Sequence, residues 1–357
     1  MTGESNICGE GVSSRNDLKG IQCLRGIAAM LVVALHAGIF TFGMSETGNI
    51  GVLTLGNAGV DIFFVISGFV MYVSTLSKEK SPLLFLYERW ARIAPLYYLF
   101  TVIYVFLLFL DGSKLPSIAD LFTTLAFIPW VNSISGVAMP VLGVGWTLNY
   151  EMIFYLFVCV AMVFPKNVRI ISISICFGGL AASRFLFHPT NPALARLASP
   201  LWLEFIFGIL AGKVLFPSCA LDRYRNILNN CDIGMILSGV GFILMSVPVL
   251  CGLVLPRTFG YGIPALAIVI GFAISEPLFD RPTMNWLRKI GDSSYSLYLS
   301  HGILIFVLRS VGIVLPQALT SCFLLLVVSI VFGYLCYVFI ERPFGSILKR
   351  RKRPSST

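Results

Sequence analysis

The chain has 357 residues, of which 57% are apolar and only 12% charged, and its mean hydropathy is +0.87. A soluble domain usually carries about 25% charged residues, so this composition excludes a water-soluble globular protein and predicts an integral membrane protein. The formal net charge of +9 does not indicate nucleic-acid binding, because the basic residues lie in short segments between apolar runs and in the tail 349–353.

The apolar runs predict an all-α, polytopic membrane bundle of about ten helices, because each run has close to the ~20 residues that span a bilayer. An even number of spans places both termini on the same side of the membrane. The positive-inside rule assigns that side to the cytosol, because all but five of the 26 Lys and Arg residues then lie there. The exceptions are Lys114, Arg184, Arg196, Arg257 and Arg309. The expected helix limits are 20–40, 57–77, 94–111, 143–164, 168–187, 199–216, 232–250, 258–275, 291–314 and 318–340.

The extramembrane segments are short. Residues 1–17 are polar and are predicted to be a disordered cytosolic segment, residues 18–343 form the membrane domain, and residues 344–357 form a basic cytosolic tail. The longest outer connection, 112–142, contains an apolar piece at 121–131 that is too short to span and predicts an interfacial or re-entrant helix. The nine cysteines are scattered without a C-x-x-C pair, which predicts structural thiols and no metal site.

The first apolar run contains both a cation and a titratable imidazole. Arg25 and His36 are eleven residues apart, so on a helix they share one face and differ in depth by roughly 16 Å. Polar groups of this kind are costly to bury in a bilayer and mark functional sites, although His36 could also serve a helix–helix hydrogen bond. We therefore expect a functional site along this face.

Two carboxylates are expected near the depth of His36. Counted from the inner ends of their helices, His36 and Asp61 both lie roughly 24 Å from the cytosolic boundary, and Glu151 lies roughly 21 Å from it. A carboxylate beside an imidazole fixes its tautomer and raises its basicity, as a general base requires. Depth alone does not decide whether Asp61 or Glu151 contacts His36, and each could instead bridge helices separately.

Basic residues gather at the inner ends of the first and third helices. Arg89 and Arg92 precede a helix expected to begin near 94–95, whose unpaired N–H groups would add to a phosphate site. Lys19 and Arg25 would join this site if the two helices pack together. The alternative is a plain positive-inside anchor.

A third polar face lies on the ninth helix. Ser294, Tyr298 and His301 are spaced i, i+4 and i+7 and therefore line one side of it. His301 is expected roughly 15 Å from the cytosolic boundary, shallower than His36. That depth favours a pore lining or a second polar contact over membership of the same catalytic centre.

These residues occur in motifs that resemble, in order, those of the acyltransferase-3 family of membrane acyltransferases. The matching segments are Leu18 to Ala29 with His36, Gly59 to Phe69, the pair Arg89 and Arg92, Gly145 to Glu151, Ser294 to His301, and Glu341 to Pro343. The Gly145 to Glu151 segment resembles the family's Trp-Ser-Leu-x-x-Glu. Many members carry Ser-Leu-Ser-x-Glu where this chain has Thr147 and the Asn149–Tyr150 pair, a departure that leaves the carboxylate in place. The resemblance extends from residue 18 to residue 343.

The resemblance implies transfer of an acyl group, usually acetyl from acetyl-CoA, to a sugar hydroxyl of an envelope glycan, and the chain is most similar to bacterial exopolysaccharide acetyltransferases. It implies a multi-pass protein of the bacterial inner membrane, in contact with lipid and with a polysaccharide or lipid-linked oligosaccharide acceptor. The polysaccharide-synthesis machinery is a further expected partner, and no nucleic acid is expected. In this interpretation Trp146, Tyr298 and His301 contact substrate.

A mechanism follows as a hypothesis. Arg25, Arg89, Arg92 and Lys19 bind the CoA phosphates, the extended pantetheine arm brings the thioester to His36, and Asp61 or Glu151 assists. His36 acts as general base or accepts the acetyl group transiently. The alternatives are a transporter of a glycan or small anion, since intramembrane ionisable residues also mark transport paths, and a non-catalytic partner that passes on a lipid-linked sugar.

Overall fold

The computed structural model describes residues 18–43, 51–76, 80–216 and 230–350, and these ranges contain helices and no strands. The all-α prediction is therefore confirmed. The segment 1–17 and residues 351–357 of the basic tail lie outside the described residues, whereas 344–350 are helical. The elements are α1 (Lys19–Phe42), η2 (Gly51–Asn57), α3 (Ala58–Met71), η3 (Tyr72–Leu76), α4 (Pro82–Leu110), α5 (Ile118–Leu125), η4 (Gly143–Gly145), α6 (Trp146–Ala161), α7 (Lys166–Phe187), α8 (Pro192–Leu197), α9 (Trp202–Leu215), α11 (Cys231–Leu250), η5 (Thr258–Gly262), α12 (Ile263–Ile274), α13 (Glu276–Phe279), η6 (Pro282–Met284), α14 (Asn285–Asp292), α15 (Ser294–Ser310), α16 (Leu319–Cys336), η7 (Tyr337–Glu341) and α17 (Arg342–Arg350).

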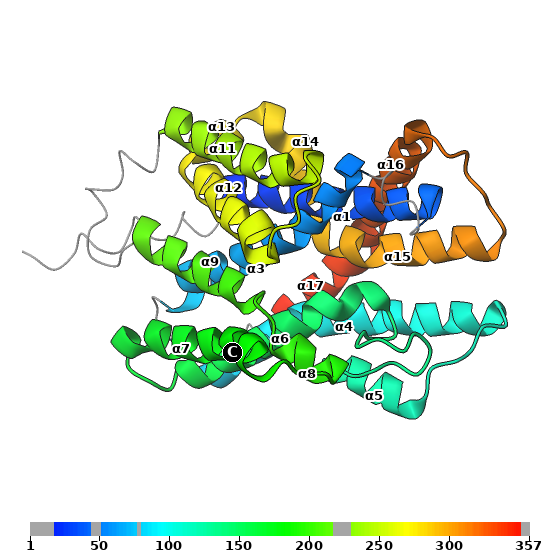
Figure 1. Ribbon diagram of the computed structural model, residues 1–357, viewed down its shortest axis with the longest axis horizontal. Helices are drawn as coiled ribbons and strands as arrows, with labels where there is room; N and C mark the ends of the chain where they lie inside the picture. The colour runs from blue at the N-terminus through cyan, green and yellow to red at the C-terminus, as the bar shows by residue number, and fades with distance from the viewer. Residues whose placement is uncertain (1–17, 44–50, 77–79, 217–229, 351–357) are drawn as a thin grey trace, which may run out of the picture.

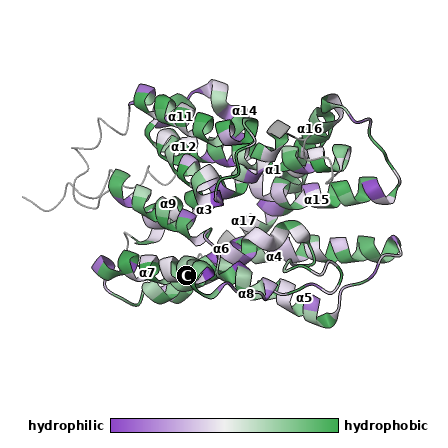
Figure 2. Cartoon of the chain, viewed as in Figure 1, coloured by the Kyte–Doolittle hydropathy of each residue, from purple (hydrophilic) through white to green (hydrophobic). Residues whose placement is uncertain are grey.

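Eight helical segments within the described ranges are long and apolar enough to cross a bilayer. The other two predicted spans, 258–275 and 291–314, correspond to shorter helices, namely the apolar segment Thr258–Ile274 and the 17-residue α15. Hydrophobic residues make up most of each long helix (Figure 2). These features are those of a multi-pass membrane protein. The sidedness of the termini stays a prediction.

The helices form two layers that meet along the centre of the molecule (Figure 1). One layer contains α1, α3, α11, α12, α15 and α16, and the other contains α4, α5, α6, α7 and α8. Helix α9 joins them, because it packs on both α3 and α7, and α15 also contacts α4. Helices α1, α3 and α15 of the first layer thereby face α4 and α6 of the second.

The contact between α3 and α9 depends on two glycines. A Cβ atom at Gly68 would lie 2.1 Å from the carbonyl oxygen of Phe205, and one at Gly208 would lie 2.0 Å from that of Val65. Small residues allow membrane helices to approach this closely. The two helices therefore pack backbone against backbone, which fixes the position of α3 relative to α9.

We predict that Gly208→Ala destabilises the protein by about 1–3 kcal/mol, because the added methyl group forces α3 and α9 apart. The matched control is Gly179→Ala on α7, where an added Cβ meets nothing within 4 Å. Unfolding in detergent would measure both variants. Equal stability of Gly208→Ala and the wild type would contradict the close packing.

Candidate active site

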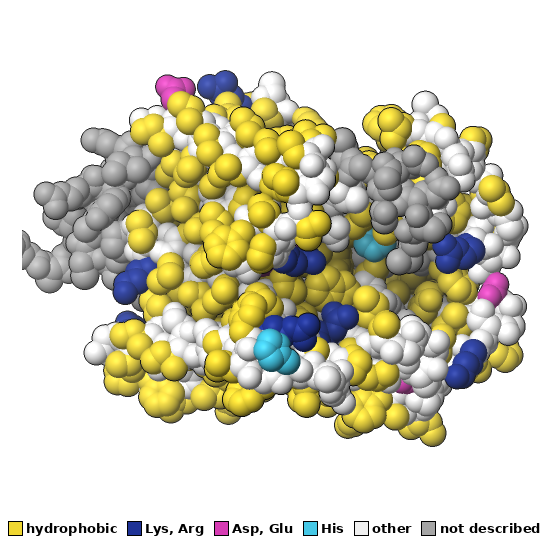
Figure 3. Space-filling model, in the orientation of Figure 1, with side chains coloured by type: hydrophobic (Ala, Val, Ile, Leu, Met, Phe, Trp, Pro, Cys, Tyr) yellow, Lys and Arg dark blue, Asp and Glu magenta, His cyan; other side chains and the backbone are white. Residues whose placement is uncertain are grey.

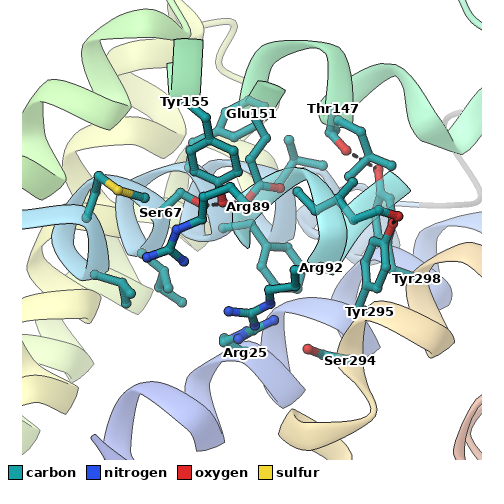
Figure 4. A pocket seen from close by; sticks show the side chains of 18 residues that line it. Arg25, Ser67, Arg89, Arg92, Thr147, Glu151, Tyr155, Ser294, Tyr295 and Tyr298 are labelled. Atoms are coloured by element: carbon teal, nitrogen blue, oxygen red, sulfur yellow. Dashed lines mark hydrogen bonds between the residues drawn. The ribbon is translucent and has the colours of Figure 1, made fainter. Parts of the chain in front are cut away.

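A pocket lies between α1, α3, α4, α6 and α15, with about 840 Å³ of space free of protein atoms, including the part that opens to the outside (Figure 4). Its polar lining consists of three arginines, one carboxylate and several hydroxyl groups. These are Arg25, Arg89, Arg92, Glu151, Ser67, Thr147, Tyr155, Ser294, Tyr295 and Tyr298.

The three predicted phosphate-binding arginines are brought together in this pocket. Arg25 of α1 and Arg92 of α4 lie near one another (Figure 4), and their charges repel. Arg89 is held over the rings of Phe85 and Tyr155, at 5.5 and 5.7 Å from the ring centroids, and donates to Ser74 Oγ at 3.1 Å. Such a group of cations is suited to an anionic ligand with several phosphates.

The prediction of a helix start near 94–95 is wrong. Helix α4 begins at Pro82, which occupies the first turn, and Pro95 lies in its interior. Membrane helices tolerate an internal proline, because neighbouring groups satisfy the freed carbonyl. Arg89 and Arg92 therefore project from the body of α4, and the first turn of α4 is not among the elements that line their pocket.

Lys19 does not line the pocket. Glu276 accepts hydrogen bonds from the backbone amides of Lys19 at 2.6 Å and Gly20 at 2.9 Å, and so caps the otherwise unpaired start of α1. The Lys19 ammonium group pairs with Asp280 and holds the pKa of that carboxyl below its usual range. The prediction of Lys19 as a donor-binding residue is therefore not supported by its position.

Glu151 faces the arginines rather than His36. It accepts hydrogen bonds from Ser67 Oγ at 3.4 Å and from the Tyr155 hydroxyl, and it interacts electrostatically with Arg25. Glu341, which the sequence analysis did not assign to the site, also acts on Arg25 and Arg92, and it accepts a hydrogen bond from Ser296 Oγ at 2.5 Å. Both carboxylates offset part of the positive charge of the arginines.

His36 lies against the second imidazole, that of His301. Their ring centroids are 4.9 Å apart with the rings at 61°. Each Nδ1 lies close to the carbonyl oxygen four residues earlier, Val32 at 2.8 Å and Leu297 at 3.2 Å. A carbonyl only accepts, so in the neutral rings Nδ1 carries the proton and Nε2 offers its lone pair. Nε2 of His301 is buried and has no hydrogen-bond partner among the described residues.

The prediction that His301 lies shallower than His36 is wrong. Helix α14 packs beside the first turns of α1, so closely that a Cβ atom at Gly26 would lie 3.0 Å from the backbone nitrogen of Gly291. His36 and His301 each follow this contact by ten residues, so they reach the same depth. The predicted depths were counted from the inner end of each helix, and the two helices do not begin at the same depth in the membrane. The count therefore gave His301 the wrong depth relative to His36.

Tyr298 separates the pocket from the two histidines. It lines the pocket, and its ring centroid lies 5.9 Å from that of His301, whereas neither His36 nor His301 is among the lining residues. Its hydroxyl donates to the carbonyl oxygen of Val144 at 2.7 Å and accepts from Thr147 Oγ1 at 2.8 Å. The expected continuous path from the arginines to His36 is therefore closed at Tyr298.

Asp61 is also not a partner of His36. Fully buried on α3, it accepts two hydrogen bonds from the Arg257 guanidinium, at 2.9 and 2.8 Å. Glu204 of α9, equally buried, interacts with both groups. Thus neither predicted carboxylate contacts His36 within the described part of the chain. Two signals could have indicated this cluster: Arg257 lies on the side poor in basic residues, and Glu204 interrupts an apolar run.

Three π-helical segments of the described chain lie next to these groups. Segment η3 carries Ser74, which binds Arg89; Arg257 immediately precedes η5; and η7 carries Glu341. Single π-turns are frequent at functional sites, because they redirect side chains out of the regular helical register. No sequence pattern indicated these irregularities.

Trp146 begins α6 at the Tyr298 end of the pocket, one residue before Thr147. Its ring lies 6.4 Å from that of Phe64, which lines the pocket, and 5.1 Å from the guanidinium carbon of Arg196. Of the three predicted substrate-contact residues, only Tyr298 therefore lines the pocket.

Comparison with known proteins identifies the family. The model of the acyltransferase-3 family, described as an acyltransferase domain, matches residues 18–338. The chain belongs to this family. The acyltransferase is 31% identical over 298 residues to the exopolysaccharide production protein ExoZ of Rhizobium meliloti (strain 1021), covering 81% of this chain and 90% of ExoZ. It is 25% identical over 385 residues to acyltransferase MdmB of Streptomyces mycarofaciens, covering 95% and 94% of the two chains. No solved structure matches it.

The resemblance inferred from the motifs is thereby confirmed, and the protein is a multi-pass membrane acyltransferase. Its motif residues from Arg25 to His301 all lie inside the matched range. The arginine pocket, the Tyr298 wall and the histidine pair are thus the candidate parts of an acyl-transfer centre.

Proposed function

We propose that this acyltransferase moves an acetyl group from acetyl-CoA to a sugar hydroxyl of an exopolysaccharide, or of its lipid-linked precursor, at the bacterial inner membrane. The observation that supports the proposal is the placement of Arg25 and His36 along one face of α1. Arg25 lies in a pocket with two further arginines, and His36, about 16 Å farther along the helix, lies beyond the wall that closes this pocket.

The charged lining of the pocket suits the donor. CoA carries a diphosphate and a ribose phosphate, and Arg25, Arg89 and Arg92 offer planar, permanently charged donors to such groups. Glu151 and Glu341 limit the repulsion among these arginines while the pocket is empty. The narrow pantetheine arm then follows the pocket toward Tyr298.

His36 is the general base in this proposal. Its Nε2 lone pair removes the proton from the acceptor hydroxyl, and the resulting oxygen attacks the thioester carbonyl. The carbon–sulfur bond breaks, and the CoA thiolate leaves and recovers the proton from His36. The Nδ1–H bond to the Val32 carbonyl holds the ring in the tautomer that this step requires.

Tyr298 must move for the thioester to meet His36. Its hydroxyl is held by two neutral hydrogen bonds, each contributing roughly 0.5–1.5 kcal/mol, so donor binding provides enough free energy to release it. A wall that opens only with the donor bound keeps water from the thioester. His301, in contact with both Tyr298 and His36, positions the base.

The name of ExoZ, an exopolysaccharide production protein, supports a glycan acceptor. The test is transfer of radiolabelled acetyl from acetyl-CoA to oligosaccharide acceptors by the purified protein in nanodiscs. Mass spectrometry of envelope polysaccharide from cells with and without the protein would identify the acetylated sugar. Absence of acetyl transfer in an intact preparation, combined with uptake of glycan or anion into vesicles, would favour a transporter instead.

We predict that Arg89→Ala weakens acetyl-CoA binding by about 10- to 100-fold, because hydrogen bonds to charged groups contribute roughly 1.5–3 kcal/mol. The kcat at saturating acetyl-CoA should change little. Lys213→Ala, which removes an exposed basic residue of α9 outside the pocket, is the matched control. Equilibrium binding of CoA would measure both variants, and unchanged affinity of Arg89→Ala would remove this residue from the donor site.

A further inference from the structure

Arg196 is a cation of the outer side that has no carboxylate partner among the described residues. It lies in the last turn of α8, half-buried, with its guanidinium carbon 5.1 Å from the centroid of the Trp146 ring. By contrast, Arg257 is paired with Asp61, which offsets its charge. Arg196 is therefore a cation that an aromatic ring holds in place and whose guanidinium N–H groups have no hydrogen-bond acceptor among the described residues.

This cation is placed next to the reaction centre. The Tyr150 hydroxyl donates to the backbone carbonyl of Arg196 at 2.7 Å, and the Tyr150 ring packs on Trp146 at 5.9 Å. Residue Thr147, next to Trp146 in the chain, holds Tyr298. A ligand group bound to Arg196 would therefore lie beside the wall that faces the histidine pair.

Arg196 lies at the opposite end of the membrane helices from the donor arginines. It follows the C-terminus of α7, whose first residue, Lys166, belongs to the predicted cytosolic side, whereas Arg25, Arg89 and Arg92 lie in the inner parts of α1 and α4. Seen from the side of the helices, the molecule is hollowed between the two helix layers, with Lys or Arg and His side chains along the hollow (Figure 3). An acceptor can thus approach Arg196 without crossing the donor pocket.

We propose that the acceptor is an acidic glycan, and that a carboxylate on it binds the Arg196 guanidinium beside Trp146. This inference rests on the acetyl transfer proposed above and adds the charge class of its acceptor. A guanidinium group binds a carboxylate through two parallel hydrogen bonds. Its positive charge attracts an anionic sugar and neither attracts nor repels a neutral one. Arg196 is then a specificity-determining residue.

The experiment compares one acceptor in two forms: an oligosaccharide containing uronic acid, and the same oligosaccharide after reduction of its carboxyl groups. The wild-type protein in nanodiscs should acetylate the acidic form with a kcat/KM about 10- to 100-fold higher, as expected for loss of a charged hydrogen-bond pair. Arg196→Gln should lower kcat/KM for the acidic form by a similar factor. It should leave the reduced form and the KM for acetyl-CoA unchanged.

Arg184→Gln is the matched control, because it removes the same charge from an exposed position near the end of the neighbouring helix α7. It should leave the preference intact. Equal rates of the wild type on both acceptors, or an equal loss on both in Arg196→Gln, would overturn the acidic-acceptor proposal while leaving acetyl transfer in place. No transfer to either acceptor by the wild type would instead contradict the proposed function itself.

Discussion

Replacing His36 by alanine is expected to lower the kcat of acetyl transfer by about 10²- to 10⁴-fold, the usual contribution of a general base. Binding of acetyl-CoA should be unchanged, because the arginines of the donor pocket are untouched and His36 does not line it. The fold should also persist. The only protein hydrogen bond that the imidazole makes among the described residues is to the carbonyl of Val32, within its own helix.

The matched control is His188→Ala, which changes an exposed histidine at the end of α7. Rates of radiolabelled acetyl transfer and CoA affinity would be measured on both variants. Retained transfer in His36→Ala would exclude His36 from the mechanism. Trapping of a labelled acetyl-enzyme in the wild type without acceptor, lost in His36→Ala, would show that His36 carries the acetyl group covalently instead of acting as a base.

The second large effect concerns stability. Arg257→Gln is expected to destabilise the protein by about 3–5 kcal/mol, because it leaves the fully buried Asp61 carboxylate without its cation. Glu204 of α9, equally buried, interacts with the same guanidinium and would lose that contact too. The pair connects α3 with the start of η5, so its loss should loosen the packing of α12 on α3.

Unfolding by denaturing detergent would measure this effect. Arg257→Lys keeps the charge but loses the two parallel hydrogen bonds, so it should fall between Arg257→Gln and the wild type. The double variant Asp61→Asn with Arg257→Gln should recover part of the loss, since it removes both charges together. Wild-type stability of Arg257→Gln would show that Asp61 does not depend on this ion pair.

The sequence predicted the helical fold because spanning a bilayer requires about 20 apolar residues, and this signal is local. It also placed Arg25 and His36 on one face of one helix, since eleven residues make three turns. The same reasoning failed where it needed the relative depth of different helices. His301 was placed too shallow because α14 packs beside the first turns of α1, which no local pattern reveals.

The partners of the buried carboxylates were equally inaccessible to local patterns. Asp61 pairs with Arg257, which is nearly 200 residues away in the chain. Arg257 immediately precedes a π-helical segment, in which the side chains depart from the regular helical register. The depth of Glu151 in the membrane suggested that it could lie near His36. Its side chain lies on the side of α6 that faces the arginines instead. The depth of a residue in the membrane limits which residues of other helices it can contact. The side of its own helix on which it lies decides which of these contacts forms.

The most direct test of the acyl-transfer mechanism is an experimental structure of the protein in a membrane mimetic with a non-hydrolysable acetyl-CoA analogue bound. We expect phosphates against Arg25, Arg89 and Arg92, the pantetheine arm along the pocket, a displaced Tyr298 ring and the acetyl group beside His36. Phosphates bound away from these arginines, or an acetyl group that ends far from the histidine pair, would contradict this mechanism.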